Sequence, residues 1–300
     1  MSVLPANQPE DGAPAGPAAL RIESKPKDLG SFTVRRVLPA PDRRMVGPFI
    51  FFDHMGPAEF PPGEGIVVRP HPHIGLATIT YLFEGEIMHR DSLGVVQPIR
   101  AGAVNFMKAG RGIVHSERAG DDLDTHSKLH GIQSWMALPD ARQEDEPSFD
   151  HYPADALPQF AQGDVTVRVI IGEAWGKRSP VRADGRMLYL ECQMPAGSSI
   201  EVPSTYPELA AYVVSGNARI DAEDCTEGTM LVAQDGQPLR IKATEPSRVM
   251  VIGGEPVGER HIWWNFVSSS KARIEQAQAD WKANRFPHVP GETEFIPLPD

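Results

Sequence analysis

Short runs of β-forming residues, bounded by turn-forming residues such as glycine, proline, aspartate and asparagine, follow one another along most of this chain and constrain its fold class. Such runs lie at residues 32–38, 49–52, 76–83, 128–138, 165–171, 187–193, 210–214, 229–232 and 248–252. The sequence also contains 29 prolines and 27 glycines, which favour turns. Because short strands at this spacing, with no long helical pattern between them, are typical of sandwiches and barrels, we predict an all-β chain.

The runs form two halves that repeat weakly. Residues 81–85 read Tyr-Leu-Phe-Glu-Gly and residues 212–216 read Tyr-Val-Val-Ser-Gly. An acidic, proline-containing connection over residues 139–153 separates the halves, and a length of 300 residues suits two domains. We therefore predict a disordered tail at 1–20, too poor in large apolar residues to pack, domains at 21–150 and 151–258, and a C-terminal helix and tail at 259–300.

The last segment differs from the rest of the chain. We predict an amphipathic helix over residues 270–285, because the serines that open it are good caps and Ile274, Ala277 and Trp281 fall on one face. The aromatic residues of 263–266 precede this helix. We expect them to anchor it by packing on a barrel wall, since aromatic groups of this kind serve packing more often than ligand binding.

Composition excludes some classes of function. A net charge of −11 disfavours sequence-independent binding to nucleic acid or to anionic membranes. The N-terminus has neither the basic nor the apolar region of a secretory signal, and no stretch approaches the length of a membrane span. The two cysteines, Cys192 and Cys225, lack CxxC spacing, so we expect buried thiols in a reducing compartment. We predict a soluble, cytoplasmic protein.

Two pairs of potential metal ligands stand out from the β-rich background. His71 and His73 are two residues apart, and so are His115 and Glu117. Because residues i and i+2 of a strand point to the same face, each pair can direct two donors into one cavity. Three imidazoles and one carboxylate suit iron, manganese, nickel, copper or zinc rather than calcium or magnesium. We predict one mononuclear transition-metal site.

Several other histidines carry weaker signals of function. His54 follows Asp53 in a predicted turn at residues 53–57, and two interpretations stay open: it orients a ligand imidazole, or it is an ordinary turn residue. We interpret five further histidines as exposed or capping residues, namely His89, His126, His130, His151 and His288.

The second half lacks these ligands. No histidine lies between His151 and His261, and the repeat aligns His71 and His73 with Val202 and Ser204. If the second half is a copy of the first, it has lost its metal site.

At these residues the sequence resembles the pirin family of the cupin superfamily. The resemblance is carried by FIFFDHMGP (49–57), HPHIG (71–75) and AGRGIVHSE (109–117), and it extends from about Arg21 to the end of the chain. The segment IWWNFVSSS (262–270) is similar to that of the longer bacterial pirins. This resemblance implies a bicupin, with two antiparallel jelly-roll β-barrels stacked face to face and a metal only in the N-terminal one.

The resemblance also implies a ligand set. His71, His73, His115 and Glu117 would hold one iron below an open cavity, with Mn, Ni, Cu, Co or Zn as other candidates. The wider cupin pattern has a glutamate where this chain has Ala77. Since pirins take their carboxylate from the HxE pair, we expect the metal to be retained and the polarity of the cavity to differ.

By resemblance, we expect the chemistry of a quercetin 2,3-dioxygenase. A flavonol-like substrate and O2 would meet at the metal, and Glu117 would be the catalytic residue, either as a ligand or as the base for the substrate hydroxyl. The main alternative is a non-enzymatic, iron-dependent redox sensor that acts through protein partners and not directly on nucleic acid. A cupin isomerase or sugar-binding module is a third possibility. We expect a monomer.

Overall fold

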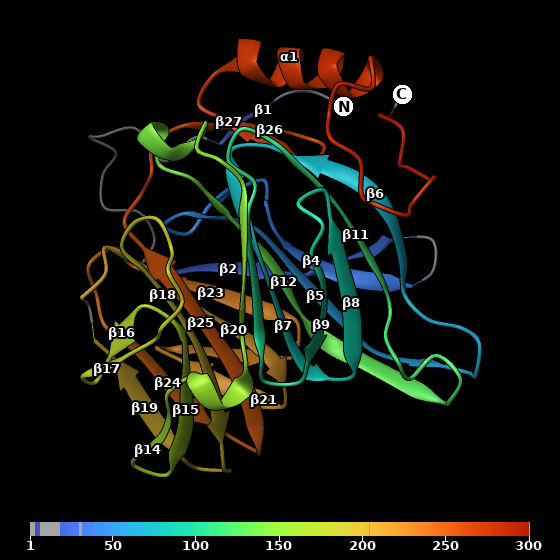
Figure 1. Ribbon diagram of the computed structural model, residues 1–300. Helices are drawn as coiled ribbons and strands as arrows, with labels where there is room; N and C mark the ends of the chain where they lie inside the picture. Colours follow the sequence, from blue (N-terminus) through green and yellow to red (C-terminus); the bar gives the residue numbers. More distant parts are fainter. Residues whose placement is uncertain (1–3, 7–18, 30–31, 204, 300) are drawn as a thin grey trace.

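The structure, a computed structural model, describes residues 4–6, 19–29, 32–203 and 205–299. These residues form two bodies of antiparallel strands that lie against each other, with one α-helix at the end of the chain (Figure 1). Each body contains one seven-stranded and one four-stranded sheet. The all-β prediction is confirmed.

The first barrel consists of two sheets that enclose a layered interior. Its larger sheet has the order β13-β10-β7-β12-β5-β4-β3 and its smaller sheet the order β6-β11-β8-β9. The strands are β3 (Lys25–Asp28), β4 (Thr33–Leu38), β5 (Phe49–Phe60), β6 (Val67–His73), β7 (Leu76–Glu84), β8 (Glu86–Asp91), β9 (Val96–Arg100), β10 (Val104–Lys108), β11 (Ile113–Ala119), β12 (Ser127–Ala137) and β13 (Ser148–Tyr152).

The second barrel repeats this plan, with sheet orders β14-β15-β18-β25-β20-β23-β2 and β19-β24-β21-β22. Its strands are β2 (Ala19–Glu23), β14 (Gln159–Gln162), β15 (Val165–Ile171), β18 (Met187–Met194), β19 (Ser199–Val202), β20 (Glu208–Ser215), β21 (Asn217–Ile220), β22 (Glu223–Thr226), β23 (Thr229–Ala233), β24 (Leu239–Ala243) and β25 (Ser247–Gly254). A small hairpin joins β16 (Glu173–Ala174) to β17 (Lys177–Arg178), and two 3-10 helices span Asp140–Arg142 and Ala154–Ala156.

The predicted segment boundaries and the sheets differ at two places. Most of the predicted tail at 1–20 lies outside the described residues, but Leu4–Ala6 forms β1, which pairs with β26 (Arg260–Trp263), and Ala19 and Leu20 open β2. Strand pairing uses backbone groups, so it does not require the large side chains that this segment lacks. The predicted boundary after residue 150 falls inside β13, which pairs with β10 of the first barrel. The division into four segments otherwise remains a prediction.

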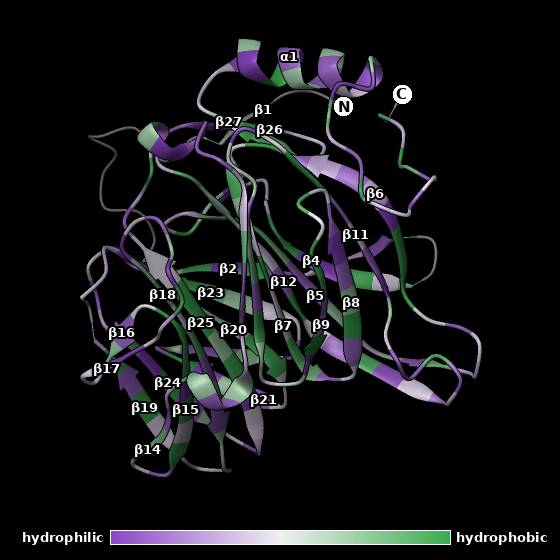
Figure 2. Ribbon diagram, viewed as in Figure 1, coloured by the Kyte–Doolittle hydropathy of each residue, from purple (hydrophilic) through white to green (hydrophobic). Residues whose placement is uncertain are grey.

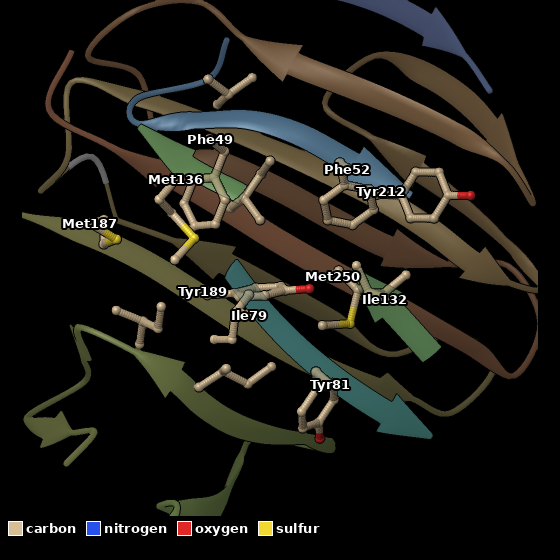
Figure 3. Packing of buried hydrophobic residues seen from close by; sticks show 14 of the residues in the cluster. Phe49, Phe52, Ile79, Tyr81, Ile132, Met136, Met187, Tyr189, Tyr212 and Met250 are labelled. Atoms are coloured by element: carbon tan, nitrogen blue, oxygen red, sulfur yellow. The ribbon is translucent and has the colours of Figure 1, made fainter. Parts of the chain in front are cut away.

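The two larger sheets face each other across a shared apolar core. Aromatic and aliphatic side chains from both barrels interdigitate there, including Phe49, Phe52, Ile79, Ile132 and Met136 from the first barrel and Met187, Tyr189, Tyr212 and Met250 from the second (Figure 3). Strands in the middle of the molecule are correspondingly rich in hydrophobic residues, whereas the surface loops are mostly hydrophilic (Figure 2). Burial of this surface holds the barrels together.

Two tyrosines of the internal repeat connect the barrels by hydrogen bonds. The Tyr81 hydroxyl donates to Glu191 Oε2 at 2.5 Å, and the Tyr212 hydroxyl lies 2.9 Å from His54 Nδ1. Tyr81 lies opposite Ile132, which pairs on to His54, and Tyr212 lies opposite Met250, which pairs on to Glu191. His54 of the first barrel therefore occupies the position that Glu191 has in the second. The two hydrogen bonds across the interface are related by the internal repeat, because each joins a tyrosine of one barrel to this position of the other.

The predicted helix is confirmed as α1 (Lys271–Lys282). The Ser270 hydroxyl accepts a hydrogen bond from the Arg273 amide at 3.4 Å and caps the first turn. Ile274 and Ala277 are buried against the end of the first barrel, beside β26 and β27 (Phe266–Ser268) (Figure 1). Within the described part of the chain, no helix has the length and apolar character needed to span a membrane.

Candidate metal site

Three of the four predicted ligands come together on the smaller sheet of the first barrel. His71 and His73 lie on β6, and His115 lies on the adjacent β11, directly opposite His71. All three side chains are buried, and one ligand atom from each lies within 4.8 Å of the others. The two-residue spacing thus places the imidazoles on one inward face, as the alternation of strands requires.

Hydrogen bonds determine which ring nitrogens of the β6 histidines carry protons. His71 Nδ1 lies 2.9 Å from the carbonyl oxygen of Arg69, and His73 Nδ1 lies 3.1 Å from that of Asn265. A carbonyl only accepts hydrogen bonds, so both Nδ1 atoms are donors and both Nε2 atoms of the neutral rings have free lone pairs. The Asn265 carbonyl belongs to the turn between β26 and β27, which explains how that turn contributes to the site.

Two buried side chains, Asp91 and His89, form a series of polar contacts that ends at His115. Asp91 Oδ2 accepts from His89 Nε2 at 2.9 Å, and the Nδ1 atom of His89 lies 3.4 Å from His115 Nδ1. The prediction that His89 is an exposed or capping residue was wrong. His89 lies on β8 opposite Glu117 and points into the barrel, where its ring stacks on Phe149 at 4.4 Å. Such outer partners orient metal-binding imidazoles.

The resulting donor set fits a cation. His73 Nε2 and His115 Nε2 are 3.1 Å apart, and the carbonyl partner of His73 Nδ1 leaves the His73 Nε2 lone pair directed at His115. Burial lowers the pKa of His71 to about 4 and those of His73 and His115 well below the usual range, so the rings are neutral, the form that binds metals. A divalent transition metal between the rings would satisfy all three nitrogens.

Glu117 lines the same cavity but stands apart from the three imidazoles. Its carboxylate does not belong to the group of mutually close ligand atoms among the described residues. The pairing register of β11 with β6 shifts between His115 and Glu117. Burial raises the pKa of Glu117 to about 7. Its roles as the fourth ligand and as the catalytic residue remain predictions.

The histidines open into a cavity of about 460 Å³. Alternate residues of β4, β5 and β12 form one wall, which includes Phe51 stacked on Trp135 with ring centres 4.0 Å apart. Trp263 and Trp264 also line the cavity, so the expectation that they only pack against the helix was incomplete. Ala77, expected to alter the cavity, instead faces the shared core between the barrels.

A row of polar side chains crosses this barrel in register. It runs over consecutive strands through Arg36, Asp53, Gln133, Thr80, Asn105 and His151. Arg36 binds Asp53, Thr80 Oγ1 donates to Gln133 Oε1 at 2.8 Å, and His151 Nδ1 lies 2.7 Å from Asn105 Oδ1. The row lies on the sheet facing the histidines, between two apolar clusters.

His54 takes no part in the metal site. The predicted turn at 53–57 is instead the middle of β5, which turns Asp53 into the cavity and His54 toward the second barrel. There His54 contacts Tyr212 and lies 2.8 Å from His130 through the two Nε2 atoms. The interpretation that His54 orients a ligand was therefore wrong, and His130 is a partly buried interface residue. His126 and His288 are exposed, as expected.

Comparison with known proteins agrees with this architecture. Residues 31–136 match the model of the Pirin family, and residues 189–287 match that of the Pirin C-terminal cupin domain. A pirin-like protein of Caulobacter vibrioides is 49% identical over 94% of this chain and 99% of its own length. A Pseudomonas aeruginosa protein provisionally named as a quercetin 2,3-dioxygenase is 38% identical over 87% of this chain and 83% of its own.

A solved structure extends the comparison to three dimensions. The crystal structure of quercetin 2,3-dioxygenase from Acinetobacter baumannii matches with a TM-score of 0.88 and 33% identity, and it covers 95% of this chain and 96% of its own. The fold is thus a pair of cupin barrels, as the resemblance implied. With both family domains matched in order along one chain, this protein belongs to the pirin family.

Proposed function

We propose that this pirin is a metal-dependent dioxygenase of the quercetin 2,3-dioxygenase type, which cleaves a flavonol-like enol with O2 and releases carbon monoxide. The observation that carries the proposal is the convergence of three neutral imidazoles at the wall of an aromatic-lined cavity of about 460 Å³. A cavity of this size suits a ligand of two or three rings. The relatives named as quercetin 2,3-dioxygenases support the same class of reaction.

In this proposal His71, His73, His115 and Glu117 hold one iron per chain, and manganese, nickel, copper, cobalt or zinc are chemically acceptable replacements. When bound, the metal supplies Lewis acidity toward the enol oxygen and a position for dioxygen. We assign the Glu117 carboxylate to metal binding and to acceptance of the proton from the substrate hydroxyl.

The remaining cavity residues position a planar substrate. The stacked side chains of Phe51 and Trp135 form an aromatic wall of the cavity against which a planar ligand can pack. Gln133 Oε1 accepts from Thr80, which leaves the Gln133 amide nitrogen to donate to a substrate oxygen. Ile262, Trp263 and Ile296 line the cavity as well and exclude bulk water from it.

The test is O2 uptake by iron-reconstituted protein with quercetin. We expect uptake with matching release of carbon monoxide, and loss of both in His115→Ala. The matched control is His126→Ala, which removes an exposed histidine outside the cavity. Glu117→Ala should retain a measurable share of its iron and lose uptake, because the three imidazoles remain.

Absence of uptake by protein that carries one iron per chain overturns the dioxygenase proposal. In that case the redox-sensing function becomes the leading one. It predicts that the set of captured protein partners changes between ferrous and ferric protein. Unchanged uptake in Glu117→Ala would remove that residue from the chemistry without overturning the reaction.

A further inference from the structure

The metal cavity has a second end that is rich in charge. Lys27, Arg36 and Asp53 line it on three successive strands, β3, β4 and β5, whereas Trp135 lies on the next strand, β12, and contacts His73 with ring centres 5.0 Å apart. Neighbouring strands are about 4.8 Å apart, so Lys27 lies three strands, roughly 14 Å, from Trp135 across the sheet, and the register places it a further four residues away along the strands. The cavity thus reaches from the histidines, past Arg36 and Asp53, to Lys27 at its rim.

A stack of flat groups connects the two ends. The Arg36 guanidinium carbon lies 4.4 Å from the centre of the Phe51 ring, which stacks on Trp135 at an interplanar angle of 11°. Arg36 Nε and Nη2 donate to Asp53 at 2.8 and 2.7 Å, and this bidentate pair fixes the guanidinium plane over the ring. A planar aromatic ligand that lies along this wall would point its far edge at Arg36.

The charges at this end do not cancel. Asp53 is buried and uses both oxygens on Arg36, and Arg36 Nη1 has no acceptor within the described part of the chain. Lys27 is exposed at the rim, and no ion pair to it is found among the described residues. Two cations thus face one carboxylate in a chain whose net charge is −11. The other carboxylate of the cavity, Glu117, lies on β11 with the histidines.

We propose that Arg36, held by Asp53, and Lys27 form an anion-recognising subsite, so that the preferred substrate is a planar aromatic enol with a carboxylate, sulfonate or sulfate group on its far ring. The inference rests on the proposed function in that it concerns the same cavity. Arg36 Nη1 would donate to the anion at short range, and Lys27 would add an attraction from the rim. A neutral flavonol is then a substrate analogue that leaves this subsite unused.

The test measures binding without turnover. Zinc-loaded full-length protein is titrated under argon with quercetin and with quercetin 5′-sulfonate, at mildly acidic pH where the phenol groups of the parent flavonol stay protonated. Quenching of tryptophan fluorescence reports binding, because Trp135, Trp263 and Trp264 line the cavity. We expect the sulfonate to bind about tenfold more tightly at low salt, with a smaller difference at high salt.

Variants assign this preference to residues. Lys27→Met should reduce the preference to about threefold, as expected for a partly screened surface charge. The double variant Arg36→Met/Asp53→Asn, which leaves no unpaired buried charge, should abolish it. Lys242→Met on β24 makes the same change of charge on the second barrel and should leave the preference intact. A thermal unfolding curve for each variant confirms that it is folded.

Three outcomes overturn the subsite: equal affinities for the two flavonols in the wild type, no binding of the sulfonate, or a preference that survives in both Lys27→Met and the double variant. The dioxygenase proposal is judged separately, by O2 uptake of the iron-loaded protein with quercetin. Uptake without a sulfonate preference overturns the subsite alone. A sulfonate preference without uptake supports the subsite and overturns the reaction.

Discussion

The two barrels of this pirin share a strand plan and differ in what fills them. When Gly85 is placed on Gly216, the pairings of the smaller sheets correspond: His115 opposite His71 matches Leu239 opposite Val202. In the same register Glu117 corresponds to Ile241 and His89 to Ile220. All four second-barrel residues are at most 1% exposed and belong to one apolar cluster. The counterpart of His73, Ser204, lies outside the described residues.

This difference separates stability from chemistry. The second barrel is filled by aliphatic side chains, whose burial stabilises the fold without any ion. The first barrel carries a layer of imidazoles and polar side chains between apolar clusters, and three of these imidazoles are close enough together to hold a cation. One strand plan thus serves as a scaffold in one half and carries a candidate metal site in the other. The predictions below test this contrast, from the largest expected effect to the smallest.

Corresponding substitutions in the two barrels should have opposite consequences. His71→Ala removes one of three imidazoles and should lower metal affinity more than about 100-fold, beyond the usual effect of an outer partner. Val202→Ala should leave metal affinity unchanged and lower the free energy of unfolding by roughly 2–3 kcal/mol, because it opens a cavity in a packed core. Metal titration and urea unfolding of both variants measure the two effects. A loss of metal affinity in Val202→Ala would contradict the separation of roles.

The buried series Asp91–His89–His115 should affect metal affinity rather than the stability of the fold. Asp91→Asn replaces the carboxylate that receives the His89 proton, and we expect metal affinity to fall about 10- to 100-fold. Competition with a chelator measures this change. Asp221→Asn, at a turn of the second barrel, is the control and should keep wild-type affinity. Equal metal affinities for Asp91→Asn and the wild type would show that Asp91 and His89 only fill space in the barrel.

The two cross-barrel tyrosines should contribute unequally although their positions correspond. Tyr81→Phe removes a hydrogen bond to a buried carboxylate and should cost about 1.5–3 kcal/mol of unfolding free energy. Tyr212→Phe removes a bond to a neutral imidazole and should cost about 1 kcal/mol. Chemical denaturation at neutral pH gives both values. The reverse order would mean that Arg248, which also pairs with Glu191, satisfies that carboxylate by itself.

The interface histidine should make the protein less stable in mild acid. Burial and nearby Arg35 lower the pKa of His54 to about 2, whereas an unfolded chain binds that proton below about pH 6.5. As the pH falls below 6.5, His54 should therefore cost up to about 1.4 kcal/mol of stability per pH unit. His54→Gln should show a shallower decline between pH 6 and 5, measured by urea unfolding. Parallel curves for the variant and the wild type would contradict the assignment.

Features with a strict period were predictable from sequence. The two-residue spacing of His71 and His73 predicted that both face the same side of one strand, and the serine caps and apolar spacing located the helix. Partners across strands were not predictable, because they depend on register. Asp53 lines the cavity and His89 contacts His115 for this reason, and nothing local to either residue signals it. Trp263 and Trp264 were identified as packing residues, but which side of the cavity they would close depends on where the β26–β27 turn docks.

The edge strands also determine the order in which the chain can be completed during synthesis. Each larger sheet has an edge strand that directly precedes, in the sequence, a strand of the other barrel. Strand β13 closes the larger sheet of the first barrel, and β2 closes that of the second. The first sheet has all its strands once the ribosome has passed Tyr152. Glu23, by contrast, pairs with Thr229, about 200 residues later, which corresponds to roughly 10–40 s of translation. The first strand of the second barrel to be made is therefore the one that waits longest for its partner, and separating the halves at residue 150 would leave the second barrel without its edge.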